Sequence, residues 1–401
     1  MLADGNEPIV EPTCFTTAVK DSNWRTAMNA EFDALLKNQT WALVPPYTAR
    51  NVIGCKWVFR VKRNADGSVE RYKVCLVAKG FHELPGIDFR DTFSPVIKPT
   101  TVRTVLSIAV SRGWVLRQFD VHNAFLHGHL SEDVYMSQPP GFVHPQFPKH
   151  ICKLKKALYG LKQSPRAWFS WLSSHLLALS FKGSRSDSSL FIYHNAIVTI
   201  YFLIYVDDLI ITASKPSAID DLLCHLKTNF AIKDLGTLNF FLGVEVLPNS
   251  SGLVLSQKRY IVDLLRKINM LEAKPVSSPM VQSTSLSAFE GDPFSDATLY
   301  RSTVGALQYF SITCLDISFT INKLSQFMYC PTNLHWQSVK HLLCYLKQTI
   351  HFGLQLHRSK FHTLQAFFDA DWAGCHDDWR STGGFCVFLG NNLISWGYKK
   401  Q

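Results

Sequence analysis

Two adjacent aspartates inside an apolar, strand-forming stretch constrain this chain more than any other feature. In the stretch 201–212, Asp207 and Asp208 interrupt a run of Tyr, Phe, Leu, Ile and Val residues. Residues of these types favour strands, so 201–206 and 209–212 are predicted to be two short strands, with the aspartates at or beside a tight hairpin turn. Because aspartate tolerates turn geometry, a solvated hairpin tip is one interpretation of the pair.

A metal-binding interpretation competes with that one. Neighbouring carboxylates repel each other, and apolar surroundings remove the water that would stabilise their charge. A divalent cation removes both penalties, and Mg²⁺ prefers oxygen ligands, usually one or two carboxylates together with substrate phosphates. A third carboxylate, Asp120, ends a predicted strand that is followed by a turn into a short helix. Asp120, Asp207 and Asp208 together would supply the carboxylates that two-metal phosphoryl transfer requires.

Three blocks of sequence resemble copia-type retrotransposon reverse transcriptases in their order and spacing. They are Phe-Asp-Val-His-Asn-Ala-Phe-Leu-His-Gly (119–128), Leu-Tyr-Gly-Leu-Lys-Gln-Ser-Pro-Arg-Ala-Trp (158–168) and Tyr-Val-Asp-Asp (205–208). The similarity extends from about Glu11 to the end of the chain. It implies an α+β fold of the right-hand polymerase type, with fingers, thumb and a palm built on an antiparallel sheet, then a helical connection and a partial ribonuclease H-like β-meander.

Periodicity and turn signals, combined with this resemblance, divide the chain into five predicted parts. They are a loosely structured segment (1–20), the fingers, palm and beginning of the thumb (21–271), a linker rich in Ser, Thr and Pro (272–298), the helical connection (299–360) and the truncated ribonuclease H-like fragment (361–401). Within the second part, Lys56–Arg63 and Val69–Lys79 are predicted to form a hairpin around Asn64–Gly67, and Val134–Ser137 with the Pro-rich run 139–148 is expected to be a connection.

The resemblance also implies a reaction and a metal site. A primer 3′-hydroxyl would attack the α-phosphate of a deoxynucleotide, with two Mg²⁺ ions (or Mn²⁺) stabilising both reacting oxygens. Asp120, Asp207 and Asp208 would hold the ions, and the Val121 carbonyl is a further candidate ligand. The implied partners are an RNA or DNA template with its primer, and deoxynucleoside triphosphates.

Further residues are candidates for substrate contacts by the same resemblance. The candidates for nucleotide binding are Lys56, Lys73, Lys79, Phe125, Gln163 and Lys233, and those for primer and template binding are Phe241, Leu242, Gly243 and Arg166. The lysines would make charge-assisted contacts to phosphate, although each also suits a solvated strand face. Phe125 matches a ribose gate whose ring clashes with a 2′-hydroxyl, and core packing is its alternative. Residues 241–243 match a primer-grip hairpin or form an ordinary strand turn.

The resemblance has limits at the end of the chain and at several single positions. Asp369 matches an acidic residue of the ribonuclease H domain, but it lacks the later acidic partners, so a vestigial role without ribonuclease H activity is expected. Family members usually carry Arg at Cys75, Arg-Pro at Cys314-Leu315, and Arg at Cys344. These departures suggest a second hypothesis, a decayed and non-catalytic nucleic-acid-binding remnant. An unrelated metal-dependent nuclease would explain the carboxylates but not the other blocks.

Composition agrees with a nucleic-acid partner. The formal net charge is +10, and Lys and Arg cluster in two places, with eight in residues 50–80 and six in residues 149–166. Such patches suit a polyphosphate. The ten cysteines include no Cys-x-x-Cys pair, which argues against a zinc ribbon and a compact disulfide framework. With no signal peptide or membrane span expected, the chain is predicted to be cytoplasmic (in a virus-like particle) or nuclear and not secreted.

Overall fold

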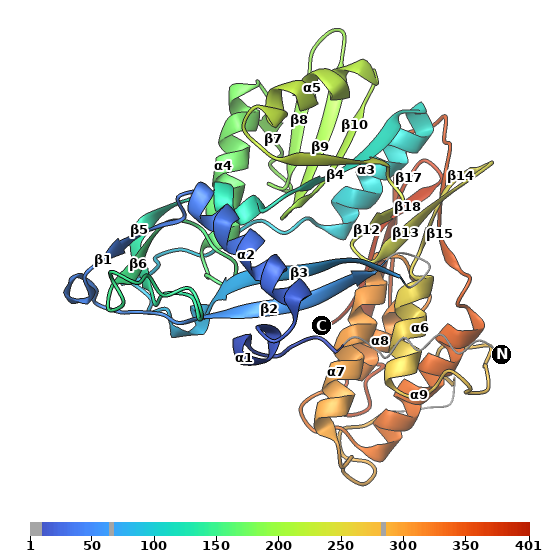
Figure 1. Ribbon diagram of the computed structural model, residues 1–401. Helices are drawn as coiled ribbons and strands as arrows, with labels where there is room; N and C mark the ends of the chain where they lie inside the picture. Colours follow the sequence, from blue (N-terminus) through green and yellow to red (C-terminus); the bar gives the residue numbers. More distant parts are fainter. Residues whose placement is uncertain (1–9, 64–67, 282–285) are drawn as a thin grey trace, which may run out of the picture.

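The computed structural model describes residues 10–63, 68–281 and 286–401. Over these ranges the chain has a mixed α/β fold with antiparallel sheets (Figure 1). The predicted Asn64–Gly67 turn and the first nine residues of the N-terminal segment lie outside the described residues. Of the helices in the described ranges, none combines the length and the apolar character that crossing a membrane requires.

A six-stranded sheet carries the aspartate pair. Its order is β11-β4-β10-β9-β8-β7, with β4 Val115–Val121, β7 Lys182–Gly183, β8 Leu190–His194, β9 Thr199–Tyr205, β10 Asp208–Ala213 and β11 Ile232–Thr237. The predicted hairpin is therefore confirmed. Side chains alternate along each strand, so Phe202 and Ile204 join one core with helices α4 (Ser164–Ala178) and α5 (Ser217–Lys227), whereas Leu203 faces helix α3 (Pro99–Arg112).

The basic hairpin also forms as predicted. Strands β2 (Cys55–Arg63) and β3 (Val69–Ala78) pair along their length, and helix α2 (Ser22–Lys37) packs on them (Figure 1). The Asp21 side chain caps α2 by accepting a bond from the Asn23 amide. The segment before it is not uniformly loose, because a short helix, α1 (Phe15–Ala18), buries Ala18.

A three-stranded sheet lies beside the hairpin, and it was only partly expected. It consists of β1 (Trp41–Val44), β5 (His129–Met136) and β6 (Ile151–Lys156), in the order β1-β6-β5. The expectation that Val134–Ser137 belongs to a connection is wrong for its first three residues, which are buried in β5 and pair with β6. The Pro-rich run 139–148 does connect β5 to β6. Short 3₁₀ helices complete this half: η1 Pro46–Thr48, η2 Gly80–His82 and η3 Ala124–His127.

The second half begins with a small sheet and a helical cluster. The sheet consists of β12 (Phe240–Phe241), β13 (Val244–Asn249), β14 (Gly252–Ser256) and β15 (Gly353–His357). Helices α6 (Lys258–Lys267), α7 (Ala297–Gln308), α8 (Ser318–Ser325) and α9 (Asn333–Gln348), with η4 (Tyr309–Ile312), surround a core of their own. The segment predicted to be a helical connection is thus helical over α7, α8 and α9, but it ends in a strand, β15, that pairs with β14.

The last three strands form the expected meander: β16 (Leu364–Ala370), β17 (Thr382–Leu389) and β18 (Asn392–Lys400). Strand β18 lies against helix α3 of the large sheet (Figure 1). Every residue of β16 is exposed, and Phe368 retains 89% of its accessible surface.

Candidate active site

The β9–β10 turn places the aspartate pair at one end of the six-stranded sheet. Tyr205 pairs with Asp208, so Val206 and Asp207 form a two-residue turn, and Val206 has a positive φ of 53°. Two neighbours hold this turn: the indole of Trp168 donates to the Val206 carbonyl at 2.6 Å, and the Val121 amide donates to the Asp207 carbonyl at 2.9 Å. The turn is therefore fixed from both β4 and α4.

The third predicted carboxylate lies next to the turn. Asp120 is directly opposite Asp208 in the β4–β10 register, and Lys233 is opposite Asp120 on its other side. Side chains opposed in this way on neighbouring antiparallel strands share a face, with Cβ atoms about 5 Å apart. Asp120, Asp208 and Lys233 are thus brought together by sheet register, although they are distant in sequence.

Burial and proximity perturb the two carboxyl groups of the pair. Burial raises the pKa of Asp208 to about 6, and the charges of Asp207 and Asp120 add to the increase, while a hydrogen bond from Gln118 opposes it. Burial likewise raises the pKa of Asp207, with Asp120 adding to it and Lys73 acting against it. Partly desolvated carboxylates that repel one another favour a proton or a cation between them.

The carboxylates suit a magnesium ion by their chemistry. Among the described residues, no three His, Cys, Asp or Glu side chains are arranged to hold an ion by themselves. Mg²⁺ does not require such a cage, because one or two carboxylates, waters and substrate phosphates usually complete its shell. Asp120, Asp207 and Asp208 offer hard oxygen donors, and the pKa values of Asp207 and Asp208 are raised, so the three carboxylates fit a divalent cation that arrives with a nucleotide.

The basic hairpin brings cations toward this site. Lys73 acts electrostatically on Asp207, and its partner across β2–β3 is Arg60. Cross-strand partners and alternate residues share a face, so Lys56 lies on the same side as Lys73 and Cys75. Lys79 follows the end of β3, where its amide donates to the Gly54 carbonyl. Lys56 is exposed, and Lys73 and Lys79 are half-buried.

Two candidates for nucleotide contact are buried instead of lying on a surface. Phe125 is 9% exposed and meets the Tyr159 ring edge-on, with centroids 4.6 Å apart. Gln163 is 2% exposed, its amide nitrogen donates to the Asp88 carbonyl, and its side-chain oxygen has no partner in the described structure. The structure therefore places Gln163 as a support for the loop around Asp88, and Phe125 at the edge of the main core.

The candidates for primer and template contact lie on two different elements. Phe241 is buried in the core beneath α3, and Leu242 and Gly243 form the β12–β13 turn with positive φ values of 50° and 65°. The Tyr309 hydroxyl donates to the Leu242 carbonyl and so fixes this turn. Arg166, at the beginning of α4, forms an ion pair with Asp91 at 3.3 Å.

Three residues near the aspartates were not predicted from the sequence. Gln118 lies close enough to Asp208 to lower its pKa, the Trp168 indole donates to the Val206 carbonyl in the turn, and Tyr159 lies close enough to Asp207 and Asp120 for their charges to act on its phenol. Burial is the main reason why the pKa of Tyr159 is raised, so its hydroxyl remains protonated. Tyr159 belongs to the 158–168 block, and that block was the sequence signal from which its place near the site could have been predicted. Gln118 has no such signal, because its sequence context is that of an ordinary strand residue.

A half-buried acid on α2, Glu31, acts electrostatically on the unusual Cys75. Desolvation raises the pKa of Glu31. A 3.4 Å hydrogen bond that its carboxylate accepts from the Leu76 amide and the positive charge of Lys73 both oppose this increase. Burial also raises the pKa of the Cys75 thiol, and the Glu31 charge adds to that increase. Among the described residues, no cation lies within ion-pair distance of Glu31.

Comparison with known proteins identifies the family. Residues 38–282 match the family described as reverse transcriptase (RNA-dependent DNA polymerase), and the chain belongs to it. Over 98% of its length, this chain is 49% and 48% identical to the Retrovirus-related Pol polyproteins from transposons RE1 and RE2 of Arabidopsis thaliana. It is 38% identical, over 94% of its length, to the corresponding polyprotein from transposon TNT 1-94 of Nicotiana tabacum.

These matches confirm the resemblance to copia-type Pol polyproteins that the three sequence blocks indicated. The chain spans only part of these relatives, covering 27% of the length of the two Arabidopsis polyproteins and 29% of the tobacco one.

Proposed function

We propose that this chain is an RNA-directed DNA polymerase that adds deoxynucleotides to a primer 3′-hydroxyl by two-metal phosphoryl transfer. The observation that supports this most directly is the position of Asp208 opposite Asp120, with Asp207 in the adjoining turn. Together with the membership in the reverse transcriptase family, this arrangement of carboxylates favours phosphoryl transfer over other metal chemistry.

Asp120, Asp207 and Asp208 would hold the Mg²⁺ ions, with the Val121 carbonyl as a further ligand. When bound, the ions lower the pKa of the attacking hydroxyl and neutralise the triphosphate. The residues of the chain orient the substrate around them. Lys73 and Lys56 share the face of the hairpin nearest the carboxylates and would take phosphate oxygens, with Lys79 beside them. Lys233 lies opposite Asp120 in the β11–β4 register, and in this proposal it would give a proton to the departing pyrophosphate.

The elements would take the parts of a right-hand polymerase. In this proposal the β2–β3 hairpin belongs to the fingers, the six-stranded sheet is the palm, and α6 begins the thumb, within residues 21–271. Residues 272–298 link this unit to the helical connection and to the ribonuclease H-like fragment, 361–401. The template–primer would lie at the end of the sheet that carries the aspartates and contact residues 241–243 and Arg166.

Primer extension on an RNA template with Mg²⁺ and deoxynucleotides tests the proposal. Asp207→Asn keeps the shape of the side chain but removes a charged ligand, so extension should be lost while template–primer binding remains, because binding depends mainly on Lys and Arg. Asp221→Asn, at an exposed position on α5, is the matched control and should extend normally. Extension by Asp207→Asn at the parent rate would reject the metal assignment. Binding without extension by the parent would favour the non-catalytic remnant.

We further propose that Asp369 has no catalytic role in this chain. It lies on the exposed strand β16, and one of its carboxylate oxygens accepts a bond from the Ala370 amide at 2.9 Å. Cleavage of RNA in an RNA–DNA hybrid, measured with Mg²⁺, should be absent. Cleavage that Asp369→Asn abolishes would contradict this proposal.

A further inference from the structure

Val206 adopts a backbone conformation that its side chain disfavours. It is the first of the two turn residues between β9 and β10, and its φ is 53°, whereas Asp207, the second, has no positive φ. A β-branched residue is a rare occupant of this region, because its Cβ crowds the backbone. Turns with a positive φ at the first central position alone usually have glycine there. The turn that carries Asp207 is therefore strained, and such strain persists only where surrounding contacts hold it.

Two hydrogen bonds hold the peptide groups on either side of Asp207. The Trp168 indole donates to the Val206 carbonyl at 2.6 Å, and this carbonyl belongs to the peptide that precedes Asp207. The Val121 amide donates to the Asp207 carbonyl at 2.9 Å, and that carbonyl belongs to the peptide that follows. The two peptide planes together set the direction of the Asp207 Cα–Cβ bond. Val121 acts through its backbone, so Trp168 is the side chain that holds the first plane.

The indole is itself fixed in orientation. Trp168 is 1% exposed, its ring meets Phe230 edge-on with centroids 5.6 Å apart, and His127 lies 5.9 Å away. Helix α4 comes so close to Gly128 that a Cβ there would be 2.8 Å from the Trp168 amide nitrogen. An indole packed in this way cannot follow a moving turn, so the turn must fit the donor.

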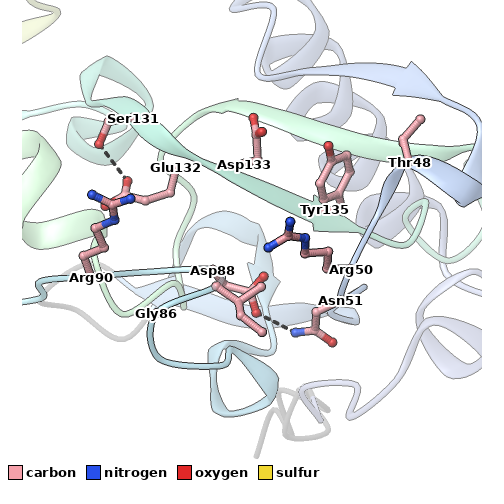
Figure 2. A pocket seen from close by; sticks show the side chains of 11 residues that line it. Thr48, Arg50, Asn51, Gly86, Asp88, Arg90, Ser131, Glu132, Asp133 and Tyr135 are labelled. Carbon is pink, nitrogen blue, oxygen red and sulfur yellow. Dashed lines mark hydrogen bonds between the residues drawn. The ribbon is translucent and has the colours of Figure 1, made fainter.

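The beginning of helix α4 is held as well. The buried side chain of Gln163 donates to the Asp88 carbonyl, and the Asp88 carboxylate accepts bonds from the Asn51 side chain at 2.5 Å and from the Leu84 amide at 2.9 Å. Figure 2, a view of the polar cavity of about 580 Å³ that Asn51 and Asp88 help to line, shows the bond between these two residues. The helix that carries Trp168 thus starts at a fixed point on the loop between η2 and α3.

We propose that Trp168 is a positioning residue of the polymerase site. Its indole N–H keeps the Val206 peptide in the strained orientation and so keeps the Asp207 carboxylate beside Asp120 and Asp208, where a divalent cation would bind. Because it is 1% exposed, Trp168 acts through the turn and not by touching substrate. The inference rests on the proposed polymerase function, since it takes Asp207 as a metal ligand.

Binding of Mn²⁺ alone, measured by electron paramagnetic resonance without nucleotide or primer, tests this role without turnover. Trp168→Phe keeps an aromatic ring but removes the donor, so it should bind Mn²⁺ about 3- to 10-fold more weakly than the parent. Trp171→Phe, on the same helix, is the matched control and should bind like the parent, because the Trp171 ring contacts His129 and His175. In primer extension, Trp168→Phe should need correspondingly more Mg²⁺ for its half-maximal rate, with template–primer affinity unchanged.

Two further variants separate the hydrogen bond from the packing of the ring. Benzothienylalanine at position 168 has the bicyclic shape of tryptophan with sulfur in place of the N–H, so it should reproduce the loss of Mn²⁺ affinity without leaving a cavity. Val206→Gly relieves the strain at positive φ, so Trp168→Phe should cost less Mn²⁺ affinity in that background. Strict additivity of the two substitutions would show that the indole does not act through the turn.

The outcomes separate this inference from the polymerase proposal. Parent-like Mn²⁺ binding by both variants at position 168 would overturn the positioning role, and so would a parent that binds Mn²⁺ no more tightly than Asp207→Asn does. Weaker Mn²⁺ binding by Trp168→Phe, in a protein whose parent extends no primer, would support the positioning role while contradicting polymerase activity. An active Trp168→Phe enzyme with the parent's Mn²⁺ affinity and Mg²⁺ dependence would do the reverse.

Discussion

Asp208 is the residue whose ionisation most directly links stability to the proposed chemistry. In the metal-free protein, burial and its acidic neighbours raise its pKa from 3.8 to about 6. The folded state therefore binds a proton more tightly than the unfolded state, so this group favours folding at low pH. That contribution is lost as the pH rises from about 4 through 6.

Asp208→Asn should remove this pH-dependent loss. The expected result is a variant that, relative to the parent, is more stable at pH above 6 than at pH below 4, because Asn cannot ionise. Thermal unfolding in a chelator across this range measures it. Adding Mg²⁺ should stabilise the parent more than the variant if the carboxylate is a ligand. A pH profile that is the same in both proteins would show that Asp208 is not perturbed in this way.

The ring of Phe125 packs in the core and is proposed to limit the sugar of the nucleotide, and the two roles can be separated by experiment. Because it is 9% exposed and packs against Tyr159, Phe125→Ala should cost about 3–5 kcal/mol of folding stability. If the ring also limits the sugar, the variant should incorporate ribonucleotides more readily. Phe125→Leu retains most of the buried volume and serves as the control for packing. Unchanged sugar discrimination in a folded Phe125→Ala protein would leave Phe125 with a core role alone.

At the residue scale, the sequence was informative where chemistry and motif coincide. Asp120, Asp207 and Asp208 were predicted to be metal ligands because three carboxylates beside apolar strands have few structural explanations. Tyr159 was missed because its relation to the aspartates depends on Phe125 and on a fold contact between distant segments. Gln163 is a candidate for nucleotide contact, and the structure adds that it is buried beneath a loop, which the sequence could not predict because the burial of a polar residue depends on the segments that pack over it.

At the scale of elements, the β2–β3 hairpin and helix α2 act as one unit. Glu31 on α2 is half-buried, its charge acts on Cys75 of β3, and it has no ion-pair partner in the described structure. A cation at position 75 would be able to pair with Glu31 as well as with a triphosphate. The two roles predict different readouts for the same substitution.

Cys75→Arg should therefore have two effects. An ion pair with Glu31 should raise the unfolding temperature, and this gain should disappear in a Glu31→Gln background. A charge-assisted contact to triphosphate, worth roughly 1.5–3 kcal/mol, should improve nucleotide use by about 10- to 100-fold in both backgrounds. Steady-state incorporation with varied deoxynucleotide measures the second effect. Equal efficiencies for parent and variant would exclude the triphosphate role.

Long periodic elements were predictable, and short or non-local strands were not. Helices α3, α4 and α9 follow clear apolar spacing. In contrast, β1 has only four residues, and the first half of β5 alternates between exposed and half-buried positions. The pairing of β15 with β14 joins segments about 100 residues apart, and local sequence contains no signal for such a partner.

At the scale of the whole molecule, the C-terminal meander is joined to the large sheet by a buried cation. Arg103 on α3 is 3% exposed, and burial lowers its pKa to about 10. Its guanidinium donates to the carbonyls of Ile394, Ser311 and Ile312 and lies 3.7 Å from the centre of the Trp396 ring. Helix α3, η4 and β18 therefore meet at one side chain.

Arg103→Ala should undock β18 and destabilise the protein by about 3–5 kcal/mol, because three buried carbonyls lose their donor and Trp396 loses its cation. Arg103→Lys keeps the charge but has no planar fork to reach all three carbonyls, so it should recover only part of the loss. Arg112→Gln, at the exposed end of the same helix, should be neutral.

Chemical denaturation measures the loss, and amide hydrogen exchange locates it. Exchange in β18 should accelerate in Arg103→Ala, while exchange in β9 and β10 should change least, because those strands form the centre of the six-stranded sheet. Protection of β18 equal to that of the parent would show that the meander is held by its apolar contacts alone. In that case Arg103 would contribute to α3 and η4 without joining the two parts of the molecule.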